Sequence, residues 1–381
     1  MRQNNKLKLL IITDFYYPHW TGISKAMLYL VKSLEDIYKI NVLTTRFDKT
    51  LLKKEVIGKT TVMRASPLFS FSRTYFSPEF LLKFFLISRS FDVIFINSPC
   101  TYILPVSILS KLLKKKLIMF HQGDLILPRS FLNRIIEKIF DFSTLVSFFL
   151  ADKVATYTED YALSSRVLKP FKNKLSSFIV PITKRINGNK KSKVTLLLKS
   201  YKEKNKILFG FAGRFVQEKG FDILFQAIPE IIKSSPDAHF FFAGSIDIKY
   251  ENFFNQTNLI YQKVKHHITL LGLLQENDLS DFYHSIDFII APSRSDCFNL
   301  TQAEAMMAGK PAVVSDIPGL RMPVKQTGFG LIFEKENYHD LAQKIIKSIL
   351  IKNLFLKSQV EVNNYFSYKK NVKAIREYIE D

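Results

Sequence analysis

Short apolar runs alternate with longer amphipathic stretches along the first half of the chain. The runs that suit buried strands occupy residues 7–12, 40–45, 93–96, 117–120 and 154–158. Stretches with the periodicity of amphipathic helices, such as residues 25–34 and 78–88, lie between them. Alternation of this kind predicts right-handed βαβ units and a mostly parallel sheet.

A polar break separates this pattern from a second occurrence of it. Between Pro181 and Lys206 the chain is rich in Lys, Asn and Ser, which indicates a linker with one short helix. Strands are then expected at residues 207–212, 239–242, 268–270, 288–291, 312–314 and 331–333. Helices are expected at residues 221–233, 279–285 and 303–308. From His339 onward the pattern is helical, with an interruption at residues 366–368.

These patterns predict an α/β protein with two Rossmann-like, doubly wound domains. The length of 381 residues suits two domains, which we expect at residues 1–185 and 186–355. Residues 356–381 are expected to form a C-terminal helix that packs back on the first domain. Two such domains facing each other favour a ligand in a cleft at the carboxyl ends of the strands.

The charge is large and unevenly placed. The net charge is +21, of which residues 1–185 carry +16. A basic field of this size attracts nucleic acid, anionic lipid headgroups or phosphorylated substrates. A generally lysine-rich composition is the alternative explanation, but it predicts no asymmetry between the halves. With 47% hydrophobic residues the chain is globular rather than disordered.

Cysteine content and hydropathy indicate the compartment. Cys100 and Cys297 form no disulfide framework and lack metal-ligand spacing, which suits a reducing compartment. The most apolar stretches are shorter than the ~20 residues that a bilayer requires. The run at residues 9–12 is too short for a secretory signal and suits a first strand. We therefore expect the cytoplasm or the cytoplasmic face of a membrane.

Several common nucleotide and metal motifs are missing from the sequence. Gly328 and Gly330 begin a G-x-G-x-x-G pattern, but Phe333 occupies its third glycine. The run at residues 57–60 is similar to the end of a P-loop, but Lys53 occupies the first glycine position. Neither a Rossmann oxidoreductase nor a P-loop NTPase is supported. Because no Asp-x-Asp occurs either, we expect a reaction that needs neither a metal nor another cofactor.

The first candidate for phosphate chemistry is the segment from Gly213 to Gly220, between an expected strand and an expected helix. Glycine allows close backbone approach, and a helix N-terminus offers free N–H groups. Arg214 adds a guanidinium fork and Lys219 a compact positive charge, which together can grip a diphosphate. An ordinary polar loop is the alternative.

The second candidate follows the strand expected at residues 288–291. Asp296 lies in the strand-to-helix loop, and Glu304 lies eight residues on, inside the next helix. A helix-borne carboxylate can accept both hydroxyls of a ribose. The N–H groups of Cys297, Phe298 and Asn299 are expected to point towards an anionic or hydroxyl-rich group. The alternative is that Asp296 caps the helix and that Glu304 is a solvated acid.

The segment at residues 292–309 resembles the E-x7-E region of retaining glycosyltransferases of family 4, which have the GT-B fold. Further motifs resemble that family and follow its order, namely Phe15-Tyr16-Tyr17-Pro18…Thr21-Gly22, Gly213-Arg214…Lys219-Gly220, Phe242-Ala243-Gly244, Leu271-Gly272, Gly309-Lys310-Pro311 and Phe366-Ser367-Tyr368. Four positions depart from the family pattern: Thr21 replaces a glycine, Ile182 an asparagine, Tyr368 a tryptophan and Asp296 a glutamate.

The resemblance implies roles for individual residues. Asp296 is expected to contact the donor sugar and Glu304 the ribose, with Arg214 and Lys219 as the diphosphate clamp. Further donor contacts are implied for residues that line these loops, Gly22, Gly213, Cys297, Phe298, Asn299 and Leu300. His121, which follows an expected strand, is similar to the histidine that faces the donor sugar from the first domain. The alternative is that His121 forms hydrogen bonds to backbone groups and has no role in a site.

The implied activity is that of a retaining hexosyl- or N-acetylhexosaminyltransferase. Its donor is expected to be a UDP- or GDP-linked sugar. Its acceptor is expected to be a glycan or a lipid-linked molecule of cell-surface polysaccharide, lipopolysaccharide or glycolipid synthesis, bound largely by the first domain. An anionic membrane surface is a further expected partner, because basic residues stand close in sequence to apolar segments of the first domain. These basic residues include Lys111, Lys114, Lys115 and Lys116. A nucleotide-sugar 2-epimerase and a basic nucleic-acid-binding protein stay open as alternatives, although no nucleic-acid-binding motif is recognised.

Overall fold

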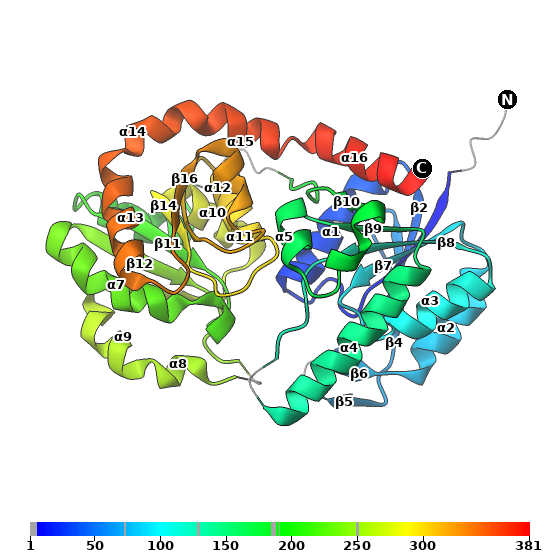
Figure 1. Cartoon of the computed structure of the whole chain (residues 1–381). Helices are drawn as coiled ribbons and strands as arrows, with labels where there is room; N and C mark the ends of the chain where they lie inside the picture. The colour runs from blue at the N-terminus through cyan, green and yellow to red at the C-terminus, as the bar shows by residue number, and fades with distance from the viewer. Residues whose placement is uncertain (1–5, 72–73, 128–129, 184–187, 190, 249–250) are drawn as a thin grey trace. The chain divides into compact units, whose positions relative to one another are not determined.

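The computed structural model describes residues 6–71, 74–127, 130–183, 188–189, 191–248 and 251–381. The chain forms two compact units (Figure 1). Unit 1 comprises Met1–Pro181 with Tyr368–Asp381, and unit 2 comprises Ile182–Ser367. The boundary expected at residues 185 and 186 lies outside the described residues. Of the expected C-terminal segment, residues 356–367 belong to unit 2, and only the last helix belongs to unit 1.

Unit 1 is built on a mixed sheet that is parallel except at one edge. Its strands have the order β10-β9-β8-β7-β1-β2-β4-β3, and β3 alone of these runs antiparallel to its neighbour. The strands of this sheet are β1 (Lys8–Ile12), β2 (Lys39–Thr45), β3 (Lys54–Ile57), β4 (Thr60–Ala65), β7 (Val93–Ser98), β8 (Lys116–His121), β9 (Lys153–Thr156) and β10 (Leu175–Ser177). A separate hairpin pairs β5 (Phe69–Phe71) with β6 (Thr74–Phe76).

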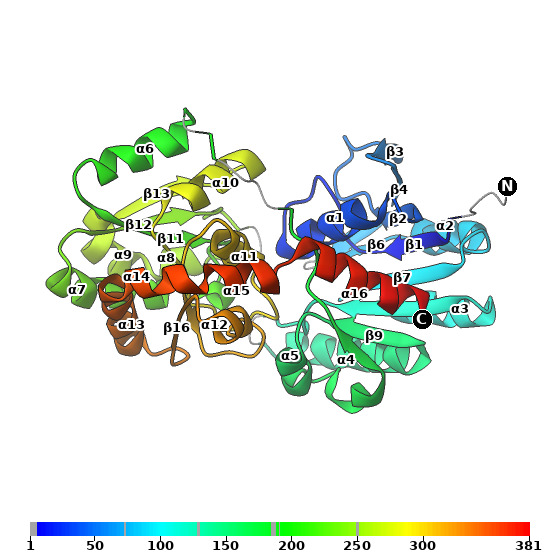
Figure 2. The same ribbon diagram turned by 90° about the horizontal axis from the view of Figure 1, so that it is seen from above.

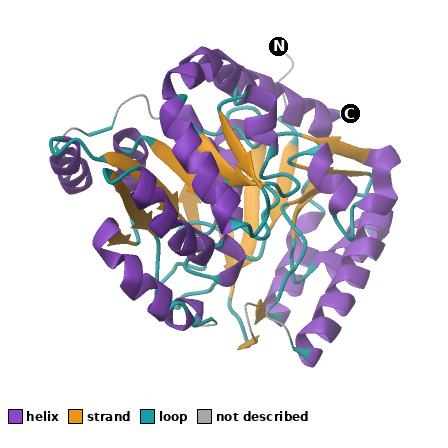
Figure 3. Ribbon diagram, turned by 60° about the vertical axis from the view of Figure 1, so that its left-hand side comes forward, coloured by secondary structure: helices purple, strands orange, loops and turns teal. Residues whose placement is uncertain are grey.

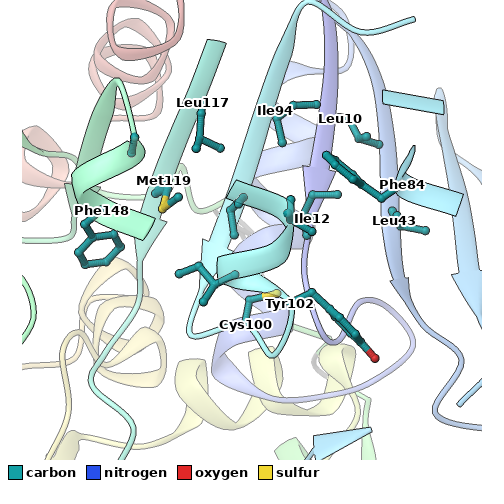
Figure 4. Packing of buried hydrophobic residues seen from close by; sticks show 14 of the residues in the cluster. Leu10, Ile12, Leu43, Phe84, Ile94, Cys100, Tyr102, Leu117, Met119 and Phe148 are labelled. Carbon is teal, nitrogen blue, oxygen red and sulfur yellow. The ribbon is translucent and has the colours of Figure 1, made fainter. Parts of the chain in front are cut away.

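Helices cover both faces of this sheet, as Figure 3 also illustrates. The helices of unit 1 are α1 (Gly22–Leu34), α2 (Pro78–Ser88), α3 (Ile103–Leu112), α4 (Phe131–Leu150), α5 (Glu159–Ser164), the 3-10 turn η1 (Lys169–Lys174) and α16 (Tyr368–Glu380). Between the sheet and α2, α3 and α4 lies an apolar core, in which Phe84 lies beside Leu10 and Leu43, and Phe148 lies beside Met119 (Figure 4). These side chains are fully buried, so the sheet is fixed against the three helices.

The C-terminal helix α16 is attached to unit 1 by specific bonds. The Tyr378 hydroxyl donates to the carbonyl oxygen of Met119 at 2.6 Å and accepts from its backbone N–H at 3.2 Å. The Tyr378 ring also packs against Phe178, with the centroids 5.3 Å apart. At the end of the helix, the Tyr38 hydroxyl donates to Glu380 at 2.7 Å. The last residues of the chain therefore complete a unit that begins with the first strand.

Unit 2 is a doubly wound, fully parallel sheet. Its strand order is β13-β12-β11-β14-β15-β16, which is the Rossmann order. These strands are β11 (Ile207–Ala212), β12 (Ala238–Ala243), β13 (Ile268–Gly272), β14 (Phe288–Ala291), β15 (Ala312–Ser315) and β16 (Gly330–Phe333). The strand order reverses between β11 and β14. The loops that follow these two strands therefore start next to each other at the carboxyl edge and lead to opposite faces of the sheet.

Two groups of helices enclose this sheet, with α7 and α13 on one side and α6 and α10 on the other (Figure 2). The helices of unit 2 are α6 (Lys193–Lys202), α7 (Phe221–Ser234), α8 (Phe253–Gln256), α9 (Asn258–Val264), α10 (Glu276–Ser285), α11 (Leu300–Met307), α12 (Met322–Thr327), α13 (Tyr338–Leu350), α14 (Lys352–Phe355) and α15 (Gln359–Tyr365). Three 3-10 turns, η2 (Gln217–Lys219), η3 (Lys265–His267) and η4 (Leu356–Ser358), link them.

The expected α/β class and the doubly wound sheets are confirmed, with differences at the edge of unit 1. The run at residues 57–60 forms the turn between β3 and β4, where Gly58 has a φ of 62°. Strands β3 to β6 and β10 were missing from the prediction because they are short or carry too many polar residues to give an apolar run. The short helix expected in the linker is α6. Within the part of the chain described, no helix is both long and apolar enough to cross a bilayer.

We predict that Tyr378→Phe destabilises unit 1 by about 1–2 kcal/mol, because it removes two buried hydrogen bonds between α16 and the Met119 backbone. Urea unfolding followed by the fluorescence of Trp20, the single tryptophan of the chain, measures this. Tyr368→Phe, at the exposed start of the same helix, is the control and should shift stability by less than about 0.5 kcal/mol. Equal effects of the two changes would contradict the assigned role of Tyr378.

Candidate active site

Both candidate phosphate-binding segments lie at one edge of unit 2. The segment from Gly213 to Gly220 follows β11, and the segment from Pro292 to Asn299 follows β14. Because β11 and β14 are adjacent and parallel, the two loops emerge side by side at the carboxyl edge. The structure thus brings together within one unit the residues that sequence analysis found in two separate motifs.

Two glycines permit close backbone contacts around the second loop. Gly220 has a φ of 64°, and a Cβ added there would lie 1.9 Å from the carbonyl oxygen of Pro292. Gly319 has a φ of 84°, and a Cβ there would lie 2.0 Å from the carbonyl oxygen of Cys297. A larger residue at either position is excluded by both backbone conformation and space. The loop after β14 is therefore held by backbone packing at both of its ends.

Arg294 joins the two loops. Its guanidinium forms a bidentate pair with Asp222, at 2.8 and 2.7 Å, and donates to the carbonyl oxygen of Gln217 at 2.8 Å. A further bond of 2.7 Å joins its Nε to Glu336. The backbone N–H of Arg294 donates to the carbonyl oxygen of Glu218 at 2.8 Å. The planar, five-donor guanidinium suits such a junction, which a lysine could not reproduce.

Lys219 and Asp296, one from each loop, form an ion pair. Nζ of Lys219 lies 2.6 Å from Oδ2 of Asp296, and the two side chains are 20% and 10% exposed. The same oxygen accepts from the Asn299 amide at 3.0 Å. Burial by itself would lower the pKa of Lys219, but the negative charges of Asp296 and Glu218 outweigh it and raise the pKa above its usual value. Lys219 is therefore a permanent cation at neutral pH.

Arg214, the other expected clamp cation, also has an acidic neighbour. Its Nη2 lies 2.9 Å from Oε1 of Glu218, four residues further along the loop. The two cations of the expected diphosphate clamp are thus each paired with a carboxylate of the protein in this structure. An ammonium or guanidinium group keeps further donors after one such bond, so an anion can share these cations.

The helix that carries Glu304 begins earlier than its sequence pattern indicates. Asn299 is its N-cap and accepts from the backbone N–H of Gln302 at 2.8 Å, so α11 begins at Leu300 rather than at Ala303. Asp296 is not the helix cap, and the N–H groups of Cys297 and Phe298 belong to the loop. Glu304 lies in the second turn of α11.

Three further residues of the predicted site pack within or beside the loop after β14. Phe298 and Leu300 are buried, and Phe298 packs against Phe366, with the ring centroids 6.5 Å apart. Burial and the neighbouring Asp296 charge raise the pKa of the Cys297 thiol well above its usual value, so it is not a thiolate nucleophile. Among the described residues no group of three or more His, Cys, Asp or Glu side chains is arranged to hold a metal ion.

His121 ends strand β8 in unit 1, and side chains occupy both of its ring nitrogens. Nδ1 lies 2.9 Å from the Ser98 hydroxyl, and Nε2 lies 3.0 Å from Oδ1 of Asp124. The imidazole is only 2% exposed. The alternative that backbone groups are the hydrogen-bond partners of His121 is therefore wrong, because both partners are side chains. A contact between His121 and a sugar therefore requires that one of these two bonds be exchanged.

Gly22 is the first residue of α1, and a Cβ added there would meet nothing within 4 Å. Beside it lies a polar network that the sequence did not reveal. Its bonds join Thr13 to Asn97, Asn97 to Gln122 and Gln122 to Tyr157, at 3.0, 2.6 and 2.9 Å. These residues end four separate strands or follow them, so no local pattern in the sequence links them. The carboxyl edge of unit 1 is therefore polar and buried.

We predict that Arg294→Ala destabilises unit 2 by about 3 kcal/mol, because the buried Asp222 carboxylate loses its bidentate partner. Arg294→Lys should restore only part of this, since a lysine cannot bond Asp222 and Gln217 in the same geometry. Urea unfolding followed by circular dichroism measures both. Lys199→Ala, which removes an exposed ion pair with Glu203, is the control and should cost less than about 0.5 kcal/mol. An Arg294→Ala protein as stable as this control would contradict the joining role.

The acid stability of unit 1 should depend on Asp124. Burial would raise the pKa of Asp124, but bonds from His121, Ser165 and the Arg166 backbone outweigh it and hold the pKa at about 2. A carboxyl with a folded pKa below its unfolded value of 3.8 stabilises the fold above that value, and the contribution is lost as the pH falls from 4 to 2. The contribution is on the order of 2 kcal/mol. The Asp124→Asn protein should not lose this stability between pH 4 and pH 2. Unfolding curves followed by Trp20 fluorescence at several pH values measure it. A variant whose stability depends on pH as the wild type's does would contradict the role of Asp124.

Comparison with known proteins gives the fold and the class of enzyme. Residues 206–350 match the family model described as Glycosyl transferases group 1. The chain is 28% identical to the uncharacterized glycosyltransferase MJ1178 of Methanocaldococcus jannaschii, over 98% of both chains. It is similar in structure to HepE of Anabaena, solved with UDP and glucose, at a TM-score of 0.78 and 16% identity over 98% of this chain and 99% of that one.

Sucrose-phosphate synthase of Thermosynechococcus elongatus is also similar, at a TM-score of 0.74 and 14% identity over 98% of each chain. At such low identities these two structures establish the GT-B fold alone. The matched residues 206–350 contain every unit 2 residue of the candidate site, from Gly213 to Glu304. The chain is therefore a glycosyltransferase of the GT-B fold, and its residues 206–350 are similar to the group 1 glycosyltransferase family.

Proposed function

We propose that this protein is a retaining glycosyltransferase of family 4 that uses a UDP-linked sugar, such as UDP-glucose, as its donor. The observation that carries the proposal is the ion pair of Lys219 with Asp296, beside Arg214, at the carboxyl edge of a Rossmann-type unit. This edge presents two cations for a diphosphate and two acids, Asp296 and Glu304, for hydroxyl groups. The complexes of HepE with UDP, with UDP and glucose and with UDP-glucose support the choice of donor.

In the proposed reaction the bond between the anomeric carbon and the diphosphate oxygen breaks, and a bond from that carbon to the acceptor oxygen forms on the same face. The leaving phosphate oxygen takes the proton of the acceptor hydroxyl, and UDP departs. Arg214 and Lys219 stabilise the negative charge that develops on the diphosphate, and no metal or other cofactor is required. Glu304 accepts the ribose hydroxyls.

Asp296 contacts the sugar in this proposal, although it is one methylene shorter than the glutamate of the resembling family. Its Oδ2 is fixed by Lys219 at 2.6 Å and by Asn299 at 3.0 Å. The same ion pair ties the sugar-binding carboxylate to the diphosphate-binding cation, so sugar and diphosphate are oriented together. His121 donates to a sugar hydroxyl from unit 1, after one of its two present bonds is exchanged.

The acceptor is proposed to be a glycan or a lipid-linked molecule of cell-surface polysaccharide or glycolipid synthesis. Residues 1–185, which carry +16 of the net charge, suit an anionic acceptor such as a lipid diphosphate. We place the enzyme in the cytoplasm, at the cytoplasmic face of a membrane, where a nucleotide sugar and a lipid-linked acceptor meet. No role in nucleic-acid binding is proposed.

We predict that Glu304→Gln weakens UDP binding ten- to a hundredfold, since a neutral amide replaces the carboxylate that accepts the ribose hydroxyls. Calorimetry with UDP, and release of UDP from a panel of nucleotide sugars with a lipid extract as the acceptor source, measure binding and turnover. Glu361→Gln, an exposed acid on α15, is the matched control and should change neither.

Other outcomes of this experiment separate the alternatives. Interconversion of a nucleotide sugar without any acceptor would identify a 2-epimerase instead. Failure of the wild-type protein to bind any nucleotide sugar would contradict the proposal. In that case, salt-sensitive binding to random oligonucleotides that Glu304→Ala leaves unchanged would favour a nucleic-acid-binding protein.

A further inference from the structure

Helix α4 of unit 1 has an apolar stripe that faces solvent. Its inner side is buried through Thr144, Ser147 and Phe148. Large apolar residues recur on its other side at spacings of three, four and seven residues, and all are exposed: Leu132, Ile135, Ile139, Phe142 and Phe149. Phe142 is 65% exposed and Phe149 77%. A helix of 20 residues is about 30 Å long, so the stripe crosses most of the unit.

Neighbouring helices extend this stripe into a face. Helix α3 packs against both α4 and α2, and Figures 1 and 2 show the three helices along the same side of the sheet. On α3, Ile108 and Leu112 are exposed, and on α2, Leu82, Phe85 and Leu86 are exposed. We call the exposed residues of α2, α3 and α4 the apolar face. Single exposed apolar residues are ordinary, but a set shared by three packed helices indicates a binding surface.

Basic residues border the apolar face. They lie at or just beyond the C-terminal ends of α2 and α3, in the first half of α4 and on the adjoining turn η1: Arg89, Lys111, Lys114, Lys115, Arg134, Lys138, Lys169, Lys172 and Lys174. Nζ of Lys174 lies 5.9 Å from the ring centroid of Phe149, at the end of the stripe. The acids of α2 and α4 are engaged: Glu79 pairs with Lys83 and Asp141 with Arg166, and Glu137 accepts from the backbone N–H of Leu127 at 2.6 Å.

We propose that the apolar face docks on an anionic lipid bilayer, with α4 lying in the plane of the interface. Apolar side chains that project between lysines and arginines suit the boundary of acyl chains and anionic headgroups. A second copy of this chain would place the basic border of one molecule against that of the other, which is unfavourable. The proposal rests on the proposed function only in that docking brings the enzyme to a lipid-linked acceptor.

Co-sedimentation with vesicles tests the docking. The full-length protein is mixed with vesicles of phosphatidylcholine, or of phosphatidylcholine with one quarter phosphatidylglycerol. We expect binding to the anionic vesicles, weakened by added salt, because the surface potential is screened over about 10 Å at 0.1 M. The pair Ile139→Glu with Phe142→Glu should lower the partition coefficient at least tenfold. Arg134→Gln with Lys138→Gln should lower it mainly at low salt.

Matched changes in unit 2 serve as controls. Leu259→Glu with Leu350→Glu alters two residues that are as exposed as those of the stripe, and Lys263→Gln with Lys265→Gln alters two exposed lysines. Neither should change the partition coefficient, and thermal unfolding checks that every variant folds. Equal binding of the stripe variant and its control would overturn the proposal. A dimer in analytical ultracentrifugation that the stripe variant loses, without vesicle binding by the wild type, would overturn it in favour of a second copy.

The same samples separate this proposal from the proposed function. Calorimetry with UDP should give the same affinity for the wild type and the stripe variant, because the apolar face contains no residue of the candidate active site. Vesicle binding by a protein that binds no nucleotide sugar would uphold docking and contradict the transferase proposal. UDP binding without vesicle binding would do the reverse.

Discussion

The arrangement of the candidate site depends on the bonds that Arg294 makes to the neighbouring loop. Two parallel strands can deliver two loops to the same edge, but the strands alone do not fix the loops' relative height or rotation. One guanidinium bonded to Asp222, Gln217 and Glu336, with its own N–H bonded to Glu218, fixes both. Lys219 and Asp296 can then meet as an ion pair, because the backbones that carry them are already in place.

Each cation at this edge already has a carboxylate partner. Partly buried positive charges are costly without a counter-charge, so a site that awaits an anionic ligand needs an internal one in the meantime. Glu218 and Asp296 provide it for Arg214 and Lys219. In the proposed function, a diphosphate that binds here would share or replace existing ion pairs rather than meet unpaired charges. The affinity for a diphosphate then depends on the difference between the ion pairs formed with the diphosphate and those already formed with Glu218 and Asp296. It does not reflect the full attraction of two cations.

Much of this could be predicted from the sequence, because the strands of unit 2 are apolar runs and its loop residues occur in compact motifs. The strands at residues 207–212 and 288–291 have the predicted bounds. Arg294 lay within a recognised segment, but its partner Asp222 is 72 residues away, and only the strand order brings them together. The N-cap at Asn299 was missed because apolar periodicity begins later than the helix does.

Unit 1 was harder to predict for related reasons. Its polar network joins ends of separate strands, and its edge hairpin carries mixed polar and apolar residues. The amphipathic pattern of α4 was visible, but the sequence could not tell which apolar residues face the core. The periodicity of a sequence shows that a helix has an apolar side, but it does not show whether that side packs against the protein core or faces solvent. In α4 only the structure distinguishes Phe148, buried against the sheet, from Phe149, which projects into solvent.

The division of the chain into units has a consequence for how the protein is made. Unit 2 is one continuous stretch, Ile182–Ser367, whereas unit 1 needs both the first strand and the helix α16. On the ribosome, all residues of unit 2 emerge before Tyr378 can reach Met119. The nascent chain can therefore finish its second unit first, while the earlier one stays incomplete until α16 has been synthesised, the reverse of the usual N-terminal-first order. A stop codon shortly after Ser367 would leave unit 2 complete and unit 1 without α16.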